Sequence, residues 1–192
     1  MKRPVLLFAT TNPHKVAEIE AMLGPCFTVK SLLDFGLPGP EETGATLEEN
    51  AEIKARYAYE RTGLPGIGED TGLFVRALHW APGVYSARFS GGGDRENREK
   101  LLYLMRGERD RYAEFRTVLA IYDGREVRFL RGVLPGRITT EERGSGGFGY
   151  DPIFVPEGHS RTLAEMSPEE KNRISHRRRA IDALLRWIVR NI

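Results

Sequence analysis

The acidic side chains of the sequence include two groups that could share a divalent cation. They are Glu41, Glu42, Glu48 and Glu49 in one group, and Glu69 and Asp70 in the other. Carboxylates are hard oxygen ligands that hold Mg²⁺ while leaving room for waters and phosphate oxygens. A carboxylate beside such an ion could also take a proton from an attacking water. Spacing alone leaves solvated surface charge as an equal alternative.

A short polar segment stands where an apolar run gives way to a helical pattern. It comprises Thr10, Thr11, Asn12, Pro13, His14 and Lys15. Backbone N–H groups at a helix start point outward, and the helix dipole there favours anions. Lys15 adds a positive charge one turn into the helix, so the segment could bind a phosphate group. It lacks the glycine pattern and the Lys-Ser/Thr pair of a P-loop, and an ordinary capped helix is the alternative.

The glycine-rich segment 144–152 (GSGGFGYDP) carries two aromatic rings and a carboxylate, those of Phe148, Tyr150 and Asp151. Glycine lets a backbone approach a ligand closely. Aromatic faces stack on bases, and a carboxylate can accept a hydrogen bond from a purine ring N–H. The alternative is a packed glycine-rich turn. A base-binding loop is therefore one of two open interpretations.

Basic residues gather toward the end of the sequence. Lys171, His176 and Arg177 lie around the boundary between two predicted helical segments, where they could bind an anion. A solvated, basic helix start is the alternative. His176 has no cysteine or histidine at the spacing of a zinc site, and neither a G-x-S-x-G motif nor a cysteine nucleophile is indicated. Together the four segments indicate one ligand type, a nucleoside polyphosphate with a divalent metal.

Composition bounds the fold and excludes several classes of protein. The chain has 192 residues, of which 40% are hydrophobic and 29% charged, so we expect one globular domain or two small lobes. Disorder, collagen and coiled coil are excluded. The net charge of +2 does not indicate a nucleic-acid binder. The single cysteine, Cys26, and the lack of a long apolar stretch predict a cytoplasmic protein with no membrane partner.

Hydrophobic periodicity and capping residues predict a mixed α/β fold with some antiparallel pairing. A strand within 4–10 leads into a helix capped by Asn12. A second helix runs from a capping box at Thr46 to about Arg61, with Asn50 and Lys54 on one face. The other elements expected are two short extended pieces within 64–75, a helix capped by Asp94, a hairpin of 117–122 and 127–133, a strand at 153–155, a helix capped by Ser167 and a final helix that buries Ile181, Leu184, Leu185 and Ile188.

Six segments, spread along nearly the whole chain, carry a family resemblance. They are 8–15 (FATTNPHK), 42–54 (ETGATLEENAEIK), 68–73 (GEDTGL), 82–91 (PGVYSARFSG), 147–154 (GFGYDPIF) and 164–177 (AEMSPEEKNRISHR). In this order they resemble the inosine triphosphate pyrophosphatase family, the XTP/dITP diphosphatases that remove non-standard purine nucleotides. Six ordered blocks of this length make the resemblance highly specific.

The resemblance implies an α/β fold with an elongated mixed sheet flanked by helices. Residues 1–192 would form a single domain with two lobes and a nucleotide cleft between them. It further implies a Mg²⁺-dependent homodimer that hydrolyses ITP, dITP and XTP to the nucleoside monophosphate and pyrophosphate. No nucleic acid or membrane would be a partner.

The resemblance also implies a role for each candidate residue. Asp70 would be the base that activates water, and Glu42 and Asp70 would hold the metal. Glu42 is preferred to Glu41 because of its spacing from Lys54. The phosphates would be bound by Thr10, Thr11, Asn12, Pro13, His14, Lys15 and Lys54. Thr71 would touch the substrate. The base and sugar would be bound by Phe148, Gly149, Tyr150, Asp151, Lys171, His176 and Arg177.

Three alternative functions remain open on the sequence. A nucleotide-binding module without hydrolytic activity would have no use for Glu42 and Asp70 as water-activating carboxylates. A nucleic-acid-binding protein could use the run from Arg177 to Arg179, but this run lacks interleaved aromatic residues. The third is a related pyrophosphatase that acts on modified pyrimidine nucleotides.

Overall fold

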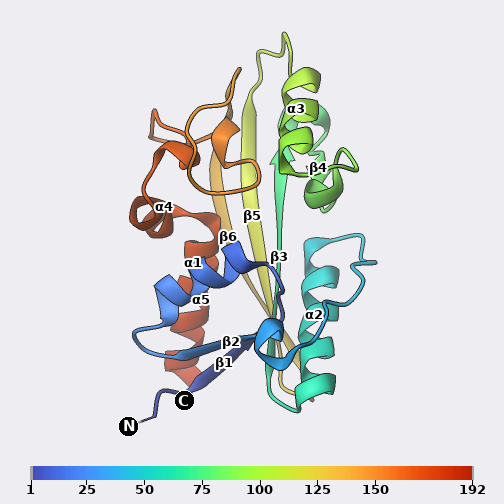
Figure 1. Cartoon of the computed structure of the whole chain (residues 1–192), viewed down its shortest axis with the longest axis vertical. Helices are drawn as coiled ribbons and strands as arrows, with labels where there is room; N and C mark the ends of the chain where they lie inside the picture. Colours follow the sequence, from blue (N-terminus) through green and yellow to red (C-terminus); the bar gives the residue numbers. More distant parts are fainter. Residues whose placement is uncertain (1, 192) are drawn as a thin grey trace. The chain divides into compact units, whose positions relative to one another are not determined.

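The computed structural model describes residues 2–191, which form a mixed α/β fold (Figure 1). The strands are β1 (Val5–Phe8), β2 (Thr28–Ser31), β3 (Gly66–Val75), β4 (Pro82–Gly83), β5 (Tyr112–Tyr122), β6 (Val127–Ile138) and β7 (Phe154–Pro156). The α-helices are α1 (Pro13–Leu23), α2 (Leu47–Thr62), α3 (Asp94–Leu104), α4 (Pro168–Ile174) and α5 (His176–Asn191). No helix within residues 2–191 combines the length and the apolar composition needed to cross a membrane.

The strands of this part of the chain join in a seven-stranded sheet in the order β2-β1-β3-β5-β6-β7, with β4 paired to β3. The sheet is mixed, as the sequence predicted, because β1 pairs in parallel with β2 and β3 whereas β3–β4 and β6–β7 are antiparallel. The predicted hairpin is confirmed: Oδ1 of Asp123 accepts hydrogen bonds from the amides of Arg125 and Glu126 in the turn between β5 and β6. Both strands are longer than the sequence predicted.

The chain divides into two compact units. The first unit comprises the described residues of Met1–Asp70, Thr117–Gly132 and Arg177–Ile192, and the second comprises Thr71–Arg116 and Val133–His176. Strands β3, β5 and β6 each supply residues to both units. The boundary in β3 falls between Asp70 and Thr71, so the two halves of one motif belong to different units.

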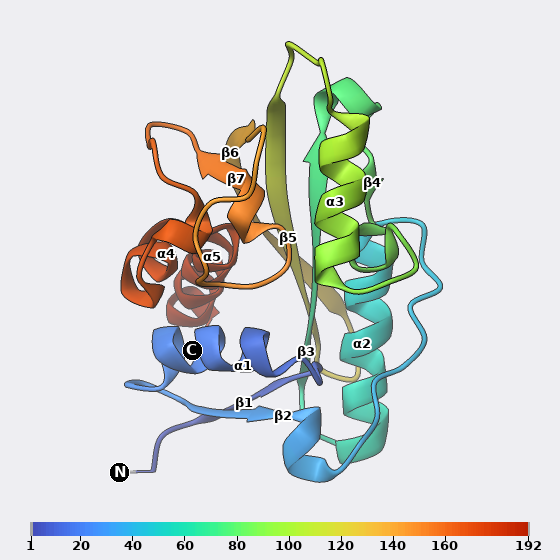
Figure 2. The same cartoon turned by 45° about the horizontal axis from the view of Figure 1, so that its top comes forward.

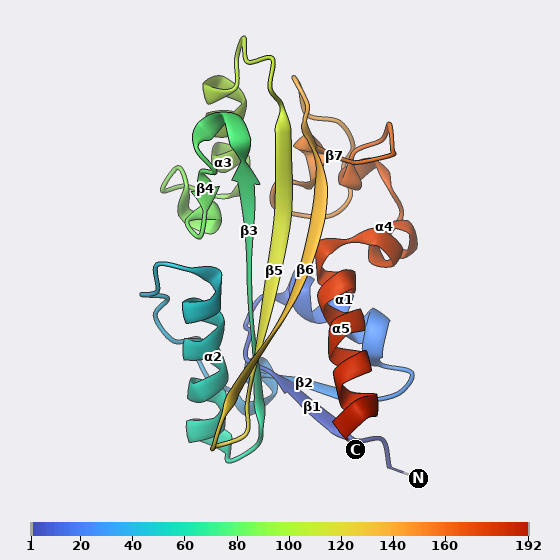
Figure 3. The same cartoon turned by 180° about the vertical axis from the view of Figure 1, so that it is seen from behind.

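In the first unit, helices cover both faces of the sheet. Helices α1 and α5 lie on one face and α2 on the other, as Figure 1 and the view from behind in Figure 3 both show. Figure 2 shows α1 running alongside β1 and β2. Alternating side chains of β1 serve the two faces: Phe8 packs in the cluster of α1 and α5, and Leu7 in the cluster that includes Ala58 of α2.

Glycines bring α2 unusually close to β3. A Cβ atom at Gly68 would lie 1.8 Å from the backbone oxygen of Ala51, and one at Gly66 would lie 2.4 Å from that of Ala55. Real Cβ atoms do not approach backbone so closely, so these positions accept glycine alone. The prediction of two short pieces in 64–75 is therefore wrong: β3 is one strand. Its glycines mark a close approach of a neighbouring element rather than a turn.

In the second unit, Leu101 of α3 and the C-cap residue Met105 pack on a core that contains Leu73 and Phe115. Figure 2 shows α3 alongside β3 and β4. The N-cap of α3 is Gly93, so the prediction of Asp94 as the cap is wrong. The carboxylate of Asp94 instead accepts a hydrogen bond from the backbone of a distant loop.

The other predicted caps occur where expected. Asn12 caps α1, Thr46 caps α2, and Ser167 caps α4 in a full capping box with Glu170. The box predicted at Thr46 is only half formed, because Glu49 accepts from the amide of Ala45 instead of closing the box. These short-range signals fix where the helices of the first unit begin, and hence where Lys15 and Lys54 stand.

Candidate functional site

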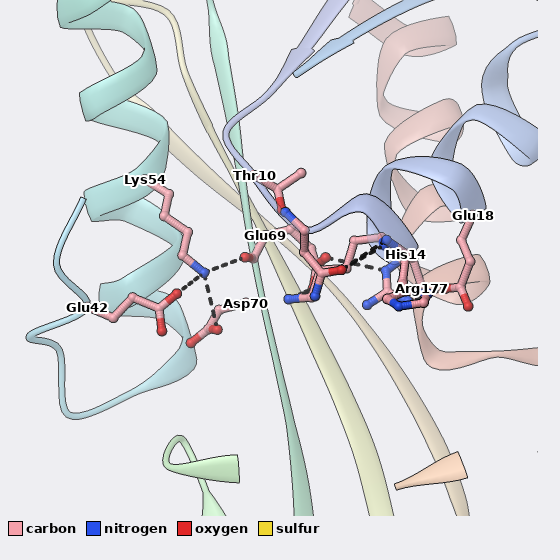
Figure 4. Close-up of polar contacts among 10 residues, drawn as sticks. Thr10, His14, Glu18, Glu42, Lys54, Glu69, Asp70 and Arg177 are labelled. Atoms are coloured by element: carbon pink, nitrogen blue, oxygen red, sulfur yellow. Dashed lines mark hydrogen bonds and ion pairs between the residues drawn. The ribbon is translucent and has the colours of Figure 1, made fainter. Parts of the chain in front are cut away.

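Strand β3 presents two neighbouring carboxylates to opposite faces of the sheet. Successive side chains of a strand alternate between faces, so Glu69 points toward α1 and α5, and Asp70 toward α2 (Figure 4). Both are buried, Glu69 being 1% and Asp70 5% exposed. Buried carboxylates require counter-charges or hydrogen bonds, and the two residues obtain them from different helices.

Lys54 of α2 contacts the acidic groups on its side of the sheet. Its Nζ lies 3.0 Å from the backbone oxygen of Glu69 and 3.4 Å from Oδ1 of Asp70, and it forms an ion pair with Glu42. The two carboxylates that the sequence singled out as a pair therefore meet at one ammonium group. Glu42 reaches it, whereas its neighbour Glu41 is exposed.

Burial sets the electrostatics of this pair. It raises the pKa of the Asp70 carboxyl, although the positive charges of Lys54 and Lys15 oppose the shift. Burial by itself lowers the pKa of Lys54, but the charges of Asp70 and Glu42 outweigh it, so the pKa of Lys54 is raised. Oδ2 of Asp70 is buried and has no hydrogen-bond partner among residues 2–191. One oxygen of Asp70 thus contacts Lys54, and the other can accept from a ligand or a water.

Glu69 joins two cations on the opposite face. Its Oε1 lies 3.4 Å from Nζ of Lys15, and its Oε2 lies 3.3 Å from Nε of Arg177. Arg177 is 1% exposed and also pairs with Glu18 of α1. Burial lowers the pKa of Lys15 despite the charge of Glu69. For Arg177 the charges of Glu69 and Glu18 outweigh burial, and the pKa of the guanidinium is raised.

The segment from Thr10 to Lys15 forms the predicted cap. Oδ1 of Asn12 accepts from the amides of His14 at 3.0 Å and Lys15 at 3.4 Å, and the backbone oxygen of Asn12 accepts from Val16. Oγ1 of the buried Thr10 accepts from the amide of Asn12 at 3.1 Å. The first amides of the helix are therefore bonded within the segment. Thr11, Pro13 and His14 are exposed, and Lys15 supplies the full charge.

The second unit assembles the glycine-rich loop with Lys171. Oδ2 of Asp151 accepts from the amide of Phe148 at 3.0 Å and from Nζ of Lys171 at 2.6 Å. Nζ of Lys171 also lies 4.5 Å from the centre of the Phe148 ring. The Tyr150 hydroxyl donates to the backbone oxygen of Ser86 at 2.6 Å. Aromatic, acidic and basic groups of the loop are thus fixed against one another.

His176 and Arg177 are neighbours in sequence but belong to different units. The ring of His176 is 3% exposed and stacks on Phe115, with centroids 4.6 Å apart and planes at 19°. The first unit therefore contains Thr10–Lys15, Glu42, Lys54, Asp70 and Arg177, and the second contains Phe148–Asp151, Lys171, His176 and the half-buried Thr71.

Two residues of the site were missed from the sequence. Glu18 was assigned no role, and Glu69 was considered only together with Asp70. The signal for Glu69 was present, because strand alternation puts it opposite Asp70 once β3 is taken as continuous. Glu18 gave no such signal, since its partner Arg177 lies 159 positions away.

The carboxylates of the first unit fit a hard divalent ion. No group of three or more His, Cys, Asp or Glu side chains within residues 2–191 is arranged to hold a metal by itself. Mg²⁺ is usually bound through only one or two carboxylates, with waters and substrate phosphates completing its shell. Glu42 and Asp70 already converge on one cationic group, and Oδ2 of Asp70 is buried without a partner in this part of the chain.

The sequence is similar to that of named proteins over most of its length. A relative from Porphyromonas gingivalis named dITP/XTP pyrophosphatase is 46% identical over 183 residues, covering 93% of this chain and 94% of the relative. One of the same name from Bacillus licheniformis is 48% identical over 186 residues, covering 93% of this chain and 95% of the relative.

The fold is also similar to that of solved structures over nearly the whole chain. A HAM1 protein from Coxiella burnetii matches with a TM-score of 0.89 and 39% identity, over 97% of this chain and 99% of that one. The Ham1 protein of Staphylococcus aureus matches with a TM-score of 0.87 and 35% identity, over 98% of this chain and 100% of that one. The sequence model of the Ham1 family matches residues 6–187. The chain therefore belongs to the Ham1 family.

Proposed function

We propose that this protein hydrolyses non-standard purine nucleoside triphosphates, dITP, ITP and XTP, to the monophosphate and pyrophosphate, and so cleanses the nucleotide pool. Relatives named dITP/XTP pyrophosphatase, 43–48% identical over nearly the whole chain, support this activity. The structural observation that carries the proposal is the convergence of Glu42 and Asp70 on the buried ammonium of Lys54, because two carboxylates and a cation are the groups that metal-assisted hydrolysis of a phosphoanhydride requires.

Asp70 is the proposed general base. The burial that raises its pKa makes its carboxylate more basic than an exposed one, and Oδ2 is the atom available to accept a proton. The water that loses this proton attacks the α-phosphorus, the bond from that phosphorus to the bridging oxygen breaks, and pyrophosphate leaves. Lys15 and Lys54 would offset the negative charge of the phosphates during this step.

Glu42 and Asp70 are also the residues proposed to hold Mg²⁺. When bound, such an ion lowers the pKa of a coordinated water and offsets phosphate charge. Lys54 pairs with both carboxylates, which brings them to the same point on this face of the sheet. The metal requirement is tested by comparing pyrophosphate release with Mg²⁺, with EDTA, and with Mg²⁺ restored.

The second unit is proposed to bind the base. Adenine differs from hypoxanthine by an amino group in place of the 6-oxo group, which exchanges a donor for an acceptor. A pocket that pairs donors with the 6-oxo group and uses Asp151 as an acceptor would leave polar groups unpaired with adenine. Such a mismatch discriminates strongly. The ring of Phe148 would stack on the base.

A substrate panel tests the activity. Pyrophosphate release from dITP, ITP and XTP should be far faster than from dATP or dGTP, and modified pyrimidine triphosphates in the same panel distinguish the related pyrophosphatase activity. Binding of dITP without release of pyrophosphate would indicate a nucleotide-binding module. Equal rates on all purines would contradict the proposed selectivity. Glu41→Gln is the matched control for Glu42→Gln, because Glu41 is the exposed neighbour.

The proposal includes a cytoplasmic homodimer, which the family resemblance implies. Light scattering after gel filtration measures the mass of the particle, against 21.7 kDa for one chain. A particle of one-chain mass at micromolar concentration would contradict this part of the proposal and leave the hydrolytic part standing.

A further inference from the structure

Helix α3 holds the middle of the loop that carries Phe148 and Asp151. The amide of Gly149 donates to Oδ2 of Asp94 at 3.1 Å, and its carbonyl oxygen accepts from NH1 of Arg98 at 2.9 Å. Asp94 and Arg98 are four residues apart and therefore lie on one face of α3. The two side chains thus hydrogen-bond both backbone groups of one residue of the loop.

The two hydrogen bonds hold the residue of the loop whose backbone has the most conformational freedom. Gly149 has a φ of +60°, in the left-handed region that glycine enters without steric cost and leaves as readily. Its N–H belongs to the peptide plane shared with Phe148, and its carbonyl to the plane shared with Tyr150. Because each plane has one group bonded to α3, the rotation of both planes is fixed.

The orientation of these planes sets the groups on either side of Gly149. The amide of Phe148 donates to the Asp151 carboxylate, and Lys171 contacts both that carboxylate and the Phe148 ring. A Cβ atom at Gly147 would lie 2.1 Å from Oδ2 of Asp151, so the carboxylate also fills the space over a second glycine. The ring of Phe148 and the carboxylate of Asp151 are therefore joined to each other by contacts that bracket Gly149.

The rest of α3 shows that the contact is specific to one face. Arg98 is only 17% exposed and is further held by Glu142. Arg95, three residues earlier, is 76% exposed and pairs with Glu99 on the same helix. The two arginines have the same charge and similar ion pairs, but Arg98 alone of the two donates to the loop.

We infer that Asp94 and Arg98 are positioning residues for purine selection, which act by fixing Gly149 and through it Phe148 and Asp151. The effect on purine selection rests on the proposed function, whereas the fixed position of Gly149 rests on its two hydrogen bonds to α3. Neither side chain needs to touch the nucleotide. A base-binding ring and acceptor that are free to shift by about 1 Å lose discrimination, because selectivity depends on unpaired groups in the wrong complex.

Four variants of the full chain separate positioning from general stability. Asp94→Ala removes the acceptor for the Gly149 amide, whereas Asp94→Asn keeps an oxygen that can accept it. Arg98→Ala removes the donor to the carbonyl, and Arg95→Ala is the matched control with the same change of charge. The readouts are the hydrogen-exchange rate of the Gly149 amide, the melting temperature, and kcat and KM for dITP and dATP.

In Asp94→Ala the Gly149 amide should exchange at least about tenfold faster, as expected for loss of a charge-assisted hydrogen bond. The preference for dITP over dATP should fall about tenfold in Asp94→Ala and Arg98→Ala, mainly through a higher KM for dITP. Asp94→Asn should restore most of both effects, and Arg95→Ala should change neither.

An unchanged exchange rate of the Gly149 amide in Asp94→Ala would overturn the inference, since the hydrogen bond from that amide to Asp94 would then not exist in solution. Faster exchange with an unaltered dITP preference would overturn it as well, because the contact would be structural only. A wild-type protein that releases no pyrophosphate from dITP would refute the proposed function instead. In that case the exchange rates and the relative dissociation constants of dITP and dATP still decide the inference.

Discussion

Replacing Asp70 by asparagine should slow turnover strongly without weakening the fold. Asparagine is nearly isosteric, and its side-chain oxygen can keep the contact with Lys54, which lies 3.4 Å away in the wild type. The charge and the capacity to take a proton are lost. Removal of a general base slows turnover by about 10²–10⁴-fold, whereas the cationic groups proposed to bind phosphates remain. Asparagine is also a weaker ligand for the proposed Mg²⁺, so the assay uses saturating Mg²⁺, at which we expect kcat for dITP to fall at least about a hundredfold and KM to change less.

The effect on stability follows from the direction of the pKa shift. Burial raises the pKa of Asp70 in the folded chain above its ordinary value of 3.8, and the charges of Lys54 and Lys15 only partly offset this. The folded state thus binds the proton more tightly than the unfolded state. The stability that Asp70 contributes is present below pH 3.8 and is lost as the pH rises through the raised pKa. Asparagine has no charge and avoids this loss.

At neutral pH, Asp70→Asn should therefore be at least as stable as the wild type, and the gap should close as the pH falls toward 3.8. A gain of about 1 kcal/mol raises the melting temperature of a chain of this size by about 2–4 °C. Urea unfolding at pH 7 and pH 5 measures the difference, and pyrophosphate release measures turnover. Glu41→Gln, at an exposed carboxylate, should change neither quantity.

Two results would refute this reasoning, one for each half of it. Near-normal turnover by Asp70→Asn would remove the base role from Asp70. A melting temperature several degrees below the wild type at neutral pH would show that the ion pair with Lys54 stabilises the fold by more than burial of the carboxylate costs.

Four further substitutions, one of them a control, test the packing and charge of the first unit. Gly68→Ala puts a Cβ atom 1.8 Å from a backbone oxygen of α2, so it should cost at least about 1–3 kcal/mol in urea unfolding and slow pyrophosphate release. Gly39→Ala, where the nearest atom lies at 3.8 Å, should be tolerated. Lys15→Met should raise KM for dITP about tenfold or more, through loss of one charge-assisted contact of about 1.5–3 kcal/mol. Glu69→Gln leaves the buried Arg177 with less counter-charge and should lower the free energy of unfolding by about 3–5 kcal/mol; unchanged unfolding would contradict the pairing.

The sequence predicted those parts of the fold that depend on neighbouring residues. The caps at Asn12 and Ser167 and the Asp123-Gly124 hairpin each need only a few positions, and the structure has all three. The helical spacing of Asn50 and Lys54 likewise placed both on one buried face of α2. In each case the residues that make the contact are close together in the chain.

The predictions of secondary structure and helix caps failed where the structure depends on contacts between residues that are far apart in the sequence. The glycines of β3 suggested a turn, whereas their cause is the approach of α2, whose backbone meets Gly66 and Gly68. Asp94 has the right type for a helix cap, but its carboxylate binds Gly149, 55 positions away. No local pattern contains either partner.

The candidate site divides in the same way. The family resemblance supplied the residue types and their proposed roles, and the spacing from Lys54 favoured Glu42 over Glu41, which the geometry of the ion pair supports. The pairing of Arg177 with Glu69 spans 108 positions, so no spacing argument could have shown that Arg177 is held in the first unit by carboxylates.

The ion pairs around β3 bear on the proposed binding of a divalent cation. Four carboxylates, those of Glu18, Glu42, Glu69 and Asp70, pair with three cations, Lys15, Lys54 and Arg177. Each cation faces at least one carboxylate, so part of its positive charge is offset within the fold. A Mg²⁺ held by Glu42 and Asp70 would add positive charge on their side of the sheet. Because Glu69 and Asp70 face opposite sides of β3, the pairs of Glu69 with Lys15 and Arg177 lie on the other face and would not compete with that ion for Glu42 and Asp70.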